Sequence, residues 1–260
     1  MHPLLRFEYK YIIPYARLEE LRVRIAAFAH RDPHVRSTGE YTVRSIYFDS
    51  ADLECYQLKV AGVKRRNKVR LRGYNQGEGQ RKVFFEIKKK VDEPLYKNRA
   101  GLPYELALQL LRGQPFRPEQ YGAVIKASDL EDAQKFLYHI FARKLQPVVN
   151  VIYEREPYQF KIDPENDLRI TFDKNLRAVR APGIDELFVE KQPVMVMRGH
   201  FIMEVKFNRY LPGWVRQLVV SMGLKKGPAS KYTLCLDALR RASELDYKLS
   251  TGRWQMGKMR

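Results

Sequence analysis

The feature that most constrains this chain is a set of stretches in which charged and apolar residues alternate at the spacing of a β-strand. The clearest are residues 6–10 (RFEYK), 68–72 (KVRLR), 86–88 (EIK) and 204–206 (EVK). Residues two apart in a strand share a face, so each stretch has one charged face and one apolar face. A single stretch of this kind is typical of a solvated strand. Charges of both signs on at least four strands instead predict that the charged faces line a common interior.

The predicted fold class is α+β, with a closed antiparallel eight-stranded β-barrel and helices packed outside. The apolar faces are rich in aromatic residues and must be covered by helices. Strands are expected at about 5–12, 41–49, 66–74, 82–90, 146–158, 168–173, 188–190 and 200–207, with a hairpin loop at 75–80. Helices are expected at about 15–29, 50–58, 101–111, 130–143, 212–222 and 230–245.

Mixed-sign strands lie near both ends of the chain, which predicts one domain rather than two independent halves. This domain is expected to span residues 1–260 and to be closed by its termini, with a helix-rich insert at about 100–144. No internal repeat or low-complexity linker interrupts it.

The charge of the chain favours an anionic ligand. Lys and Arg total 48 against 30 Asp and Glu, a formal net charge of +18 that is spread over the whole chain. Cys55 and Cys235 are far apart and the histidines lack metal-ligand spacing, which disfavours a zinc site or a disulfide framework. No signal peptide or apolar run of membrane-spanning length is visible, so the expected location is cytoplasmic.

Strand parity places Lys68, Arg70 and Arg72 on one face of their strand. It also places Glu86 and Lys88 together on one face of the next strand. For residues 41–49 two alternatives stay open: either Tyr47 and Asp49 face the interior, or Arg44 does. A buried group of cations repels itself unless a polyanion occupies the space between them. Arginine suits phosphate because its planar guanidinium binds two oxygens at once.

Carboxylates beside these cations would repel a bare anion, so they need a separate explanation. Glu8, Glu86 and Glu204 fit as direct or water-mediated ligands of Mg²⁺ or Mn²⁺, which bind through one or two carboxylates together with phosphate oxygens. By themselves, Lys88-Lys89-Lys90 and Lys225-Lys226 are more typical of a strand end and a solvated turn. The aromatic residues are expected on the wall opposite the charges, which disfavours stacking with nucleic-acid bases.

The ordered series of stretches resembles the VTC (vacuolar transporter chaperone) domain, the polyphosphate polymerase branch of the CYTH/triphosphate tunnel metalloenzyme superfamily. The resemblance covers nearly the whole chain. It rests, in order, on 6–11 (RFEYKY), 45–49 (SIYFD), 68–72 (KVRLR), 85–88 (FEIK), 97–99 (KNR), 153–155 (YER), 168–173 (LRITFD), 203–206 (MEVK) and 230–232 (SKY). It implies a tunnel of eight antiparallel strands that holds polyphosphate or a nucleoside triphosphate, and transfer of the γ-phosphate of ATP onto a polyphosphate chain.

Residue roles follow from the resemblance. The cations expected to act in the transfer are Lys10, Arg70, Arg72, Lys88, Arg155 and Arg169. Further phosphate contacts are expected from Lys68, Lys97, Arg99, Lys206 and Lys231. The expected metal is Mn²⁺ or Mg²⁺, held by Glu204 with Glu86 and Glu8.

One departure bears on the choice of activity. Arg6 stands where the superfamily's Glu-x-Glu-x-Lys pattern has its first Glu, which predicts a weaker second metal site and favours chain binding over hydrolysis. Two alternatives stay open: an inorganic tripolyphosphatase or nucleoside triphosphatase, and a non-catalytic polyphosphate-binding module. The expected partners are ATP and inorganic polyphosphate or triphosphate. The sequence shows neither the SPX domain nor the membrane segments of the eukaryotic complex, so any membrane association is expected through a separate subunit.

Overall fold

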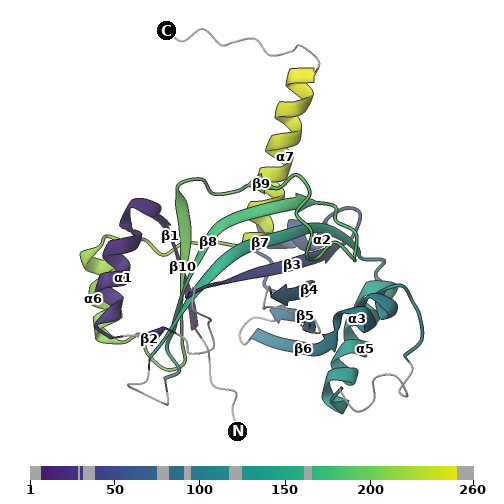
Figure 1. The fold of residues 1–260 in the computed structure, drawn as a ribbon, viewed down its shortest axis with the longest axis horizontal. Coiled ribbons are helices and arrows are strands. Elements are labelled where there is room, and N and C mark those ends of the chain that lie inside the picture. Colours follow the sequence, from purple (N-terminus) through teal and green to yellow (C-terminus); the bar gives the residue numbers. More distant parts are fainter. Residues whose placement is uncertain are drawn as a thin grey trace.

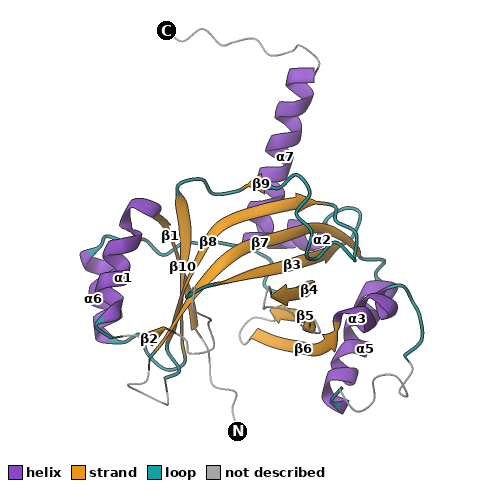
Figure 2. Cartoon of the chain, viewed as in Figure 1, coloured by secondary structure: helices purple, strands orange, loops and turns teal. Residues whose placement is uncertain are grey.

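A computed structural model of the chain describes residues 7–28, 30–31, 39–74, 82–90, 95–116, 125–160 and 166–250. Its centre is one antiparallel sheet whose eight main strands follow the order β1-β10-β8-β7-β3-β4-β5-β6 (Figures 1 and 2). These strands are β1 (Phe7–Pro14), β3 (Tyr41–Asp49), β4 (Arg66–Tyr74), β5 (Lys82–Lys90), β6 (Leu95–Pro103), β7 (Gln146–Gln159), β8 (Arg169–Arg180) and β10 (His200–Phe207). Short strands β2 (His30–Arg31) and β9 (Val194–Met195) pair with β7 and β8. The predicted α+β class with an antiparallel sheet is confirmed.

Two of the expected elements differ from the structure. Residues 95–103 form strand β6, where the prediction began a helix at 101, because Ala100 and Leu102 pair with β5 and enter the core. The expected strand at 188–190 is wrong, since this segment forms turns. It packs against β4 so closely that a Cβ on Gly73 would lie 2.7 Å from the Phe188 ring. The predicted hairpin loop at 75–80 lies outside the described residues.

The sheet curves strongly, although its described strand pairings do not close it. Within the described residues no pairing joins β1 to β6, so the hydrogen-bonded order has two ends. Charges on β1 nevertheless act on the far side of the sheet: Lys10 influences Lys68 on β4, and Glu8 influences Lys88 on β5. The sheet therefore has a concave face, defined here as the face that carries Arg70 and Glu204, and an outer face.

Four helices cover the outer face at its two ends (Figure 1). Helices α1 (Leu18–Ala26), preceded by a 3-10 turn at Tyr15–Arg17, and α6 (Gly213–Ser221) pack against β1, β10 and β8. Helices α3 (Tyr104–Leu111) and α5 (Ala127–Ala142) pack against β4, β5 and β6, where Phe85 and Phe136 stack with ring centroids 4.2 Å apart. These contacts bury the apolar faces that alternation predicted.

Helix α7 (Lys231–Ser250) corrects the expectation that every helix lies outside. Its buried residues Tyr232, Cys235 and Leu236 pack on the concave side, against Val43 and Val151. This is possible because the concave face of β7 is apolar as far as Tyr153 and becomes charged only at Arg155. The later part of α7 extends away from the sheet (Figure 1). Helix α2 (Glu54–Val60) lies beside its first half.

Strand β8 contains a β-bulge that changes which side chains face inward. Two of its residues, Asn175 and Leu176, stand opposite Tyr153 alone, and Asn175 has a φ of 51°. Asp173 before the bulge and Leu176 after it both lie on the concave side although they are three residues apart. The first half of β8 therefore adds charge to the concave face, and the second half adds apolar residues that pack against α7.

Candidate functional site

The first cluster on the concave face is a carboxylate that holds arginines from two neighbouring strands. Glu86 on β5 is fully buried, and its Oε2 accepts hydrogen bonds from Arg70 Nε at 2.7 Å and Nη2 at 2.5 Å. Arg99 Nε on β6 lies 3.2 Å from Oε1, and Arg72 Nη1 lies 3.9 Å from Oε2. Glu86 therefore fixes the guanidinium groups. These contacts leave it poorly placed to bind a metal.

Hydroxyl groups of β3 complete this cluster and settle the alternative for residues 41–49. Tyr47 Oη accepts from Arg70 Nη1 at 2.8 Å, and Ser45 Oγ accepts from Arg72 Nε at 3.1 Å. Arg44 lies on the outer face, where its Nη2 is 2.6 Å from Glu190. The arginines are thus oriented from two sides.

The second cluster lies on β1, β10, β8 and β7. Asp173 is buried and binds Arg155 through both oxygens, at 2.6 and 2.7 Å. Lys231, at the start of α7, lies 2.5 Å from Asp173 and 3.7 Å from Glu204. Lys206 also pairs with Glu204, and Arg155 lies 3.7 Å from it. The two buried carboxylates thus share Arg155 and Lys231, and Glu204 also pairs with Lys206.

The acidic groups of this cluster are ionised. Burial opposes ionisation of Glu204, but Lys206 and Lys231 outweigh it and hold the pKa of Glu204 well below its usual range. The pKa of Asp173 is also lowered: burial raises it, and Arg155 and Lys231 more than offset that effect. Glu8 pairs with Lys10 at 2.8 Å, and its pKa is lowered despite burial and despite the nearby charge of Glu204.

Tyr153 links the two clusters. Its ring lies under Lys231, with Nζ 4.7 Å from the centroid, and under Arg155, with Cζ at 5.3 Å. The same tyrosine lies near Arg70 and Arg72 of the first cluster. Cations from opposite parts of the sheet therefore converge on one stretch of the concave face.

Glu8 and Glu204 are the residues that best fit a divalent ion. They lie on the paired strands β1 and β10, and the charge of Glu204 acts to raise the pKa of Glu8. Among the described residues no group of three or more His, Cys, Asp or Glu side chains forms a metal cage. Magnesium typically binds through one or two carboxylates together with substrate phosphates. These residues therefore fit a metal that completes its coordination with phosphate oxygens.

Other predicted residues lie toward the margins of the site. Arg169 pairs with Asp167 at 3.0 Å, and its side chain is 49% exposed. Lys88 lies deeper: it faces Lys68 across β4 and β5, and burial together with nearby Arg70 lowers its pKa well below the usual range. The side chain of Lys97 and the whole of Arg6 lie outside the described residues. Sequence reasoning assigned no role to Asp173, although it shares strand parity with Arg169 and Thr171 and so carried a usable signal.

The aromatic residues do not all lie opposite the charges, as had been expected. Tyr47, Tyr153 and Phe84 share the concave face with the arginines, and Arg99 lies 3.7 Å above the Phe84 ring. Tyr47 and Tyr153 are buried, and Tyr47 stacks on Tyr232 at 4.9 Å. These two rings are covered by protein groups, so they offer no open face on which a base could stack.

Comparison with known protein families identifies this arrangement. The model of the VTC domain matches residues 5–240, which is most of the chain. The chain belongs to the VTC domain family. The deep cationic clusters described above are thus features of a VTC domain.

Individual relatives are more distant. Vacuolar transporter chaperone complex subunit 4 of Schizosaccharomyces pombe is 26% identical over 211 residues, which cover 69% of this chain and 29% of that protein. The matched part of this chain thus spans less than a third of the length of this relative. Among solved structures, a candidate adenylate cyclase of Bacillus halodurans has a TM-score of 0.49 at 13% identity, covering 87% of this chain and 94% of that one. A candidate adenylyl cyclase of Hippeastrum with triphosphatase activity has a TM-score of 0.47 at 13% identity, covering 88% and 94%.

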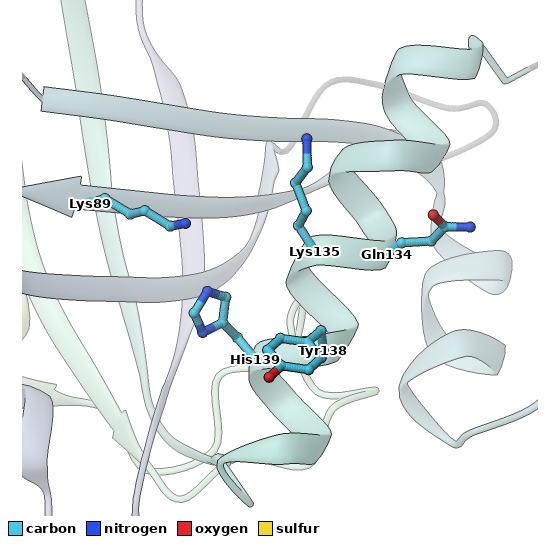
Figure 3. Close-up of a pocket in the computed structure, with 5 residues that line it drawn as sticks. All are labelled: Lys89, Gln134, Lys135, Tyr138 and His139. Carbon is cyan, nitrogen blue, oxygen red and sulfur yellow. The ribbon is translucent and has the colours of Figure 1, made fainter.

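A pocket lies on the outer face, away from the predicted site. A pocket of about 510 Å³ opens on the outer face between β5 and α5 (Figure 3), lined by Lys89, Gln134, Lys135, Tyr138 and His139. None of these five residues belongs to the predicted site.

In the part of the chain that the structure describes, no helix is both long and apolar enough to cross a membrane.

Lys68 predicts a pH dependence of anion binding. Its Nζ donates to Ser230 Oγ at 3.0 Å, and Lys10, Arg70, Lys59 and Arg66 surround it with like charge. Burial first, and then these cations, lower the pKa of Lys68 to about 7. A bound polyanion favours the charged form, so above pH 7 binding takes up a proton. We expect tripolyphosphate affinity to fall with rising pH, by up to about tenfold per pH unit.

The measurement is a titration by calorimetry between pH 7 and 9, with Lys68→Met as the control because tripolyphosphate also titrates. The pH-dependent difference between the two proteins is the contribution of Lys68.

The stability of the ligand-free protein is expected to change with pH in the opposite direction to its tripolyphosphate affinity. The unfolded state binds the extra proton between pH 7 and 10.5, so stability rises with pH in this window. Parallel pH profiles for the two proteins would contradict the assignment.

Proposed function

We propose that this VTC domain is a metal-dependent polyphosphate polymerase, a phosphotransferase that moves the γ-phosphate of ATP onto a polyphosphate chain. The observation that carries the proposal is the convergence of Arg70, Arg72, Arg155 and Lys231 on one buried concave surface beside Glu204. The similarity to the fission-yeast vacuolar transporter chaperone complex subunit 4 supports the same proposal. In this proposal the concave face closes around the phosphate chain as a tunnel.

The residues of the site would act mainly by binding and orienting. Phosphoryl transfer needs positioning and charge stabilisation more than a protein nucleophile. Arg72 is well suited to bind phosphate, because its contact with Glu86 is long, at 3.9 Å. The cysteines are unsuited to nucleophilic attack: burial raises the pKa of the Cys55 thiol to about 12 and also raises that of Cys235.

The cofactor in this proposal is Mn²⁺ or Mg²⁺, held by Glu204 and Glu8 together with phosphate oxygens. When bound, the ion neutralises charge and polarises the phosphorus under attack. Glu86 is left out of the metal site because both of its oxygens face arginines. Lys206 and Lys10, which now pair with Glu204 and Glu8, would turn toward phosphate when the ion binds.

The test is to incubate the pure protein with ATP and Mn²⁺ and to size the phosphate products on a gel. A ladder of growing chains is expected. Release of inorganic phosphate without chains would instead support a tripolyphosphatase or nucleoside triphosphatase. No turnover at any metal concentration would support a non-catalytic polyphosphate-binding module.

Arg72→Met provides the matched variant for this assay. Loss of a charge-assisted phosphate contact is expected to reduce product formation by roughly 10- to 100-fold. Arg177→Met is the control, since Arg177 pairs with Glu190 and Glu154 on the outer face. Equal effects of the two substitutions would place the phosphate away from the concave face.

The proposed partners are ATP, inorganic polyphosphate or triphosphate, and a separate membrane subunit. The relative's name as a complex subunit supports the last of these. Copurification of the tagged VTC domain with membrane proteins from its native source would test it.

A further inference from the structure

The first turn of α7 meets the charged concave face through three consecutive residues. Ser230 Oγ accepts from Lys68 Nζ at 3.0 Å, and Lys231 Nζ lies 2.5 Å from Asp173. Tyr232 Oη donates to Asp49 Oδ2 at 2.5 Å. Two of these residues point to the cations and acids of the site, whereas the third binds a buried group at the end of β3.

Asp49 is a rigid acceptor. It is fully buried, and its oxygens also accept from the backbone N–H groups of Ser50, Cys55 and Tyr56 at 2.8 to 3.0 Å. Tyr232 is 2% exposed. Burial and the bond to Asp49 raise its pKa, so its hydroxyl keeps the proton that it donates. The Tyr232–Asp49 bond therefore ties α7 to β3 and to the start of α2.

The same ring touches the arginine cluster indirectly. Tyr232 stacks on Tyr47 with centroids 4.9 Å apart and an interplanar angle of 22°, and Tyr47 Oη accepts from Arg70. Tyr232 thus contacts Tyr47, which orients Arg70, and it directly follows Lys231 in the chain.

The net electrostatic environment of Lys231 is favourable, because Asp173 and Glu204 outweigh burial and raise its pKa, but two weaker effects oppose its place in the first turn of α7. Lys231 lies at the start of α7, where the positive end of the helix dipole repels a cation. Arg155 adds like charge nearby, and Asp173 has to be shared between Arg155 and Lys231. Helix ends fray readily when such repulsion is not offset by packing or hydrogen bonds.

We propose that Tyr232 is a positioning residue: its hydrogen bond to Asp49 fixes the first turn of α7 so that Lys231 and Ser230 face a bound phosphate chain. This inference rests on the phosphate ligand of the proposed function but not on the transfer reaction. Tyr232 itself need not touch the ligand.

The structure offers a matched control for this bond. Tyr56 Oη on α2 donates to Asp237 Oδ1 on α7 at 2.5 Å, which joins the same helix through the same chemistry. It lies about one and a half turns beyond Tyr232 along α7 and contacts none of the described cations of the concave face. Tyr56→Phe therefore removes an equivalent hydrogen bond without disturbing the first turn.

The experiment is metal-free titration of tripolyphosphate by calorimetry into the wild type, Y232F, Y56F, K231M and the double variant Y232F/K231M. Y232F keeps the ring that stacks on Tyr47 and is expected to bind roughly tenfold more weakly, while Y56F binds as the wild type does. K231M should lose a similar factor. The double variant should bind within about twofold of K231M alone, because both changes remove the same contribution.

Several outcomes would overturn the inference. One is that Y232F matches Y56F in affinity while both lose stability in urea. Another is that the losses of Y232F and K231M multiply in the double variant. If Y232F does not fold, D49N tests the bond from the acceptor side, and unchanged affinity in folded D49N would also refute the proposal. Failure of the wild type to bind tripolyphosphate would instead count against the proposed function.

Discussion

Glu86→Gln is expected to lower the free energy of unfolding of the ligand-free protein by about 3–5 kcal/mol. The substitution keeps the shape of the side chain but leaves buried Arg70, bound at 2.5 and 2.7 Å, and the neighbouring Arg72 and Arg99 without their shared counter-charge. Equilibrium unfolding in urea measures the change. Tripolyphosphate should stabilise this variant by more than it stabilises the wild type, because its oxygens replace the lost carboxylate charge.

The control for this prediction is Glu156→Gln. Glu156 is a buried carboxylate of the outer face that binds Arg22 at 2.6 Å and Lys174 at 2.9 Å. Its loss should destabilise the protein by a comparable amount, but tripolyphosphate should stabilise this variant only as much as the wild type. A Glu86→Gln protein as stable as the wild type, or equal ligand effects in the two variants, would show that Glu86 does not organise the anion site.

The second large effect is expected from Glu204→Gln. If Glu204 holds the ion in the proposed reaction, ATP-dependent product formation should fall by roughly 100- to 1000-fold. Metal-free tripolyphosphate affinity should not fall and should rise, because one negative charge has left a surface that still carries Lys206, Lys231 and Arg155. Product gels and calorimetry on the same preparation measure the two quantities.

Opposite changes in turnover and affinity are what distinguish a metal ligand from a residue that only supports the fold. Glu190→Gln is the control, since this carboxylate pairs with Arg44 and Arg177 on the outer face and should affect neither quantity. Turnover of Glu204→Gln above about a tenth of the wild-type rate would exclude a role in holding an essential ion.

Much of the concave face could be predicted from strand parity. Arg70, Arg72 and Glu86 lie on one face because alternation is a local property of the backbone, and the structure brings these three together. Parity also places Val149, Val151, Tyr153 and Arg155 on one face of β7, so that charge enters this face only at Arg155. These inferences needed no knowledge of which strands are neighbours.

The parts that could not be predicted depend on contacts between distant segments. No local pattern in 95–103 distinguishes a strand, since its pairing with β5 decides the outcome. Helix α7 is amphipathic in either location, and only the apolar surface of Val43, Val149 and Val151 places it on the concave side. The pairing of Glu86 with Arg99 likewise depends on β6 lying beside β5.

The bulge in β8 has a consequence for how this sequence tolerates insertions and deletions. If β8 instead alternated strictly through Asn175, every side chain after that residue would lie on the opposite face. Arg177 would then be directed under α7, while Leu176 and Ala178 would be turned toward solvent and the outer-face acids. The bulge absorbs the extra residue and so keeps the ionic half and the apolar half of β8 on the same side of the sheet. Deleting Asn175 should therefore leave these faces unchanged, because Asp173 and Leu176 would become two residues apart.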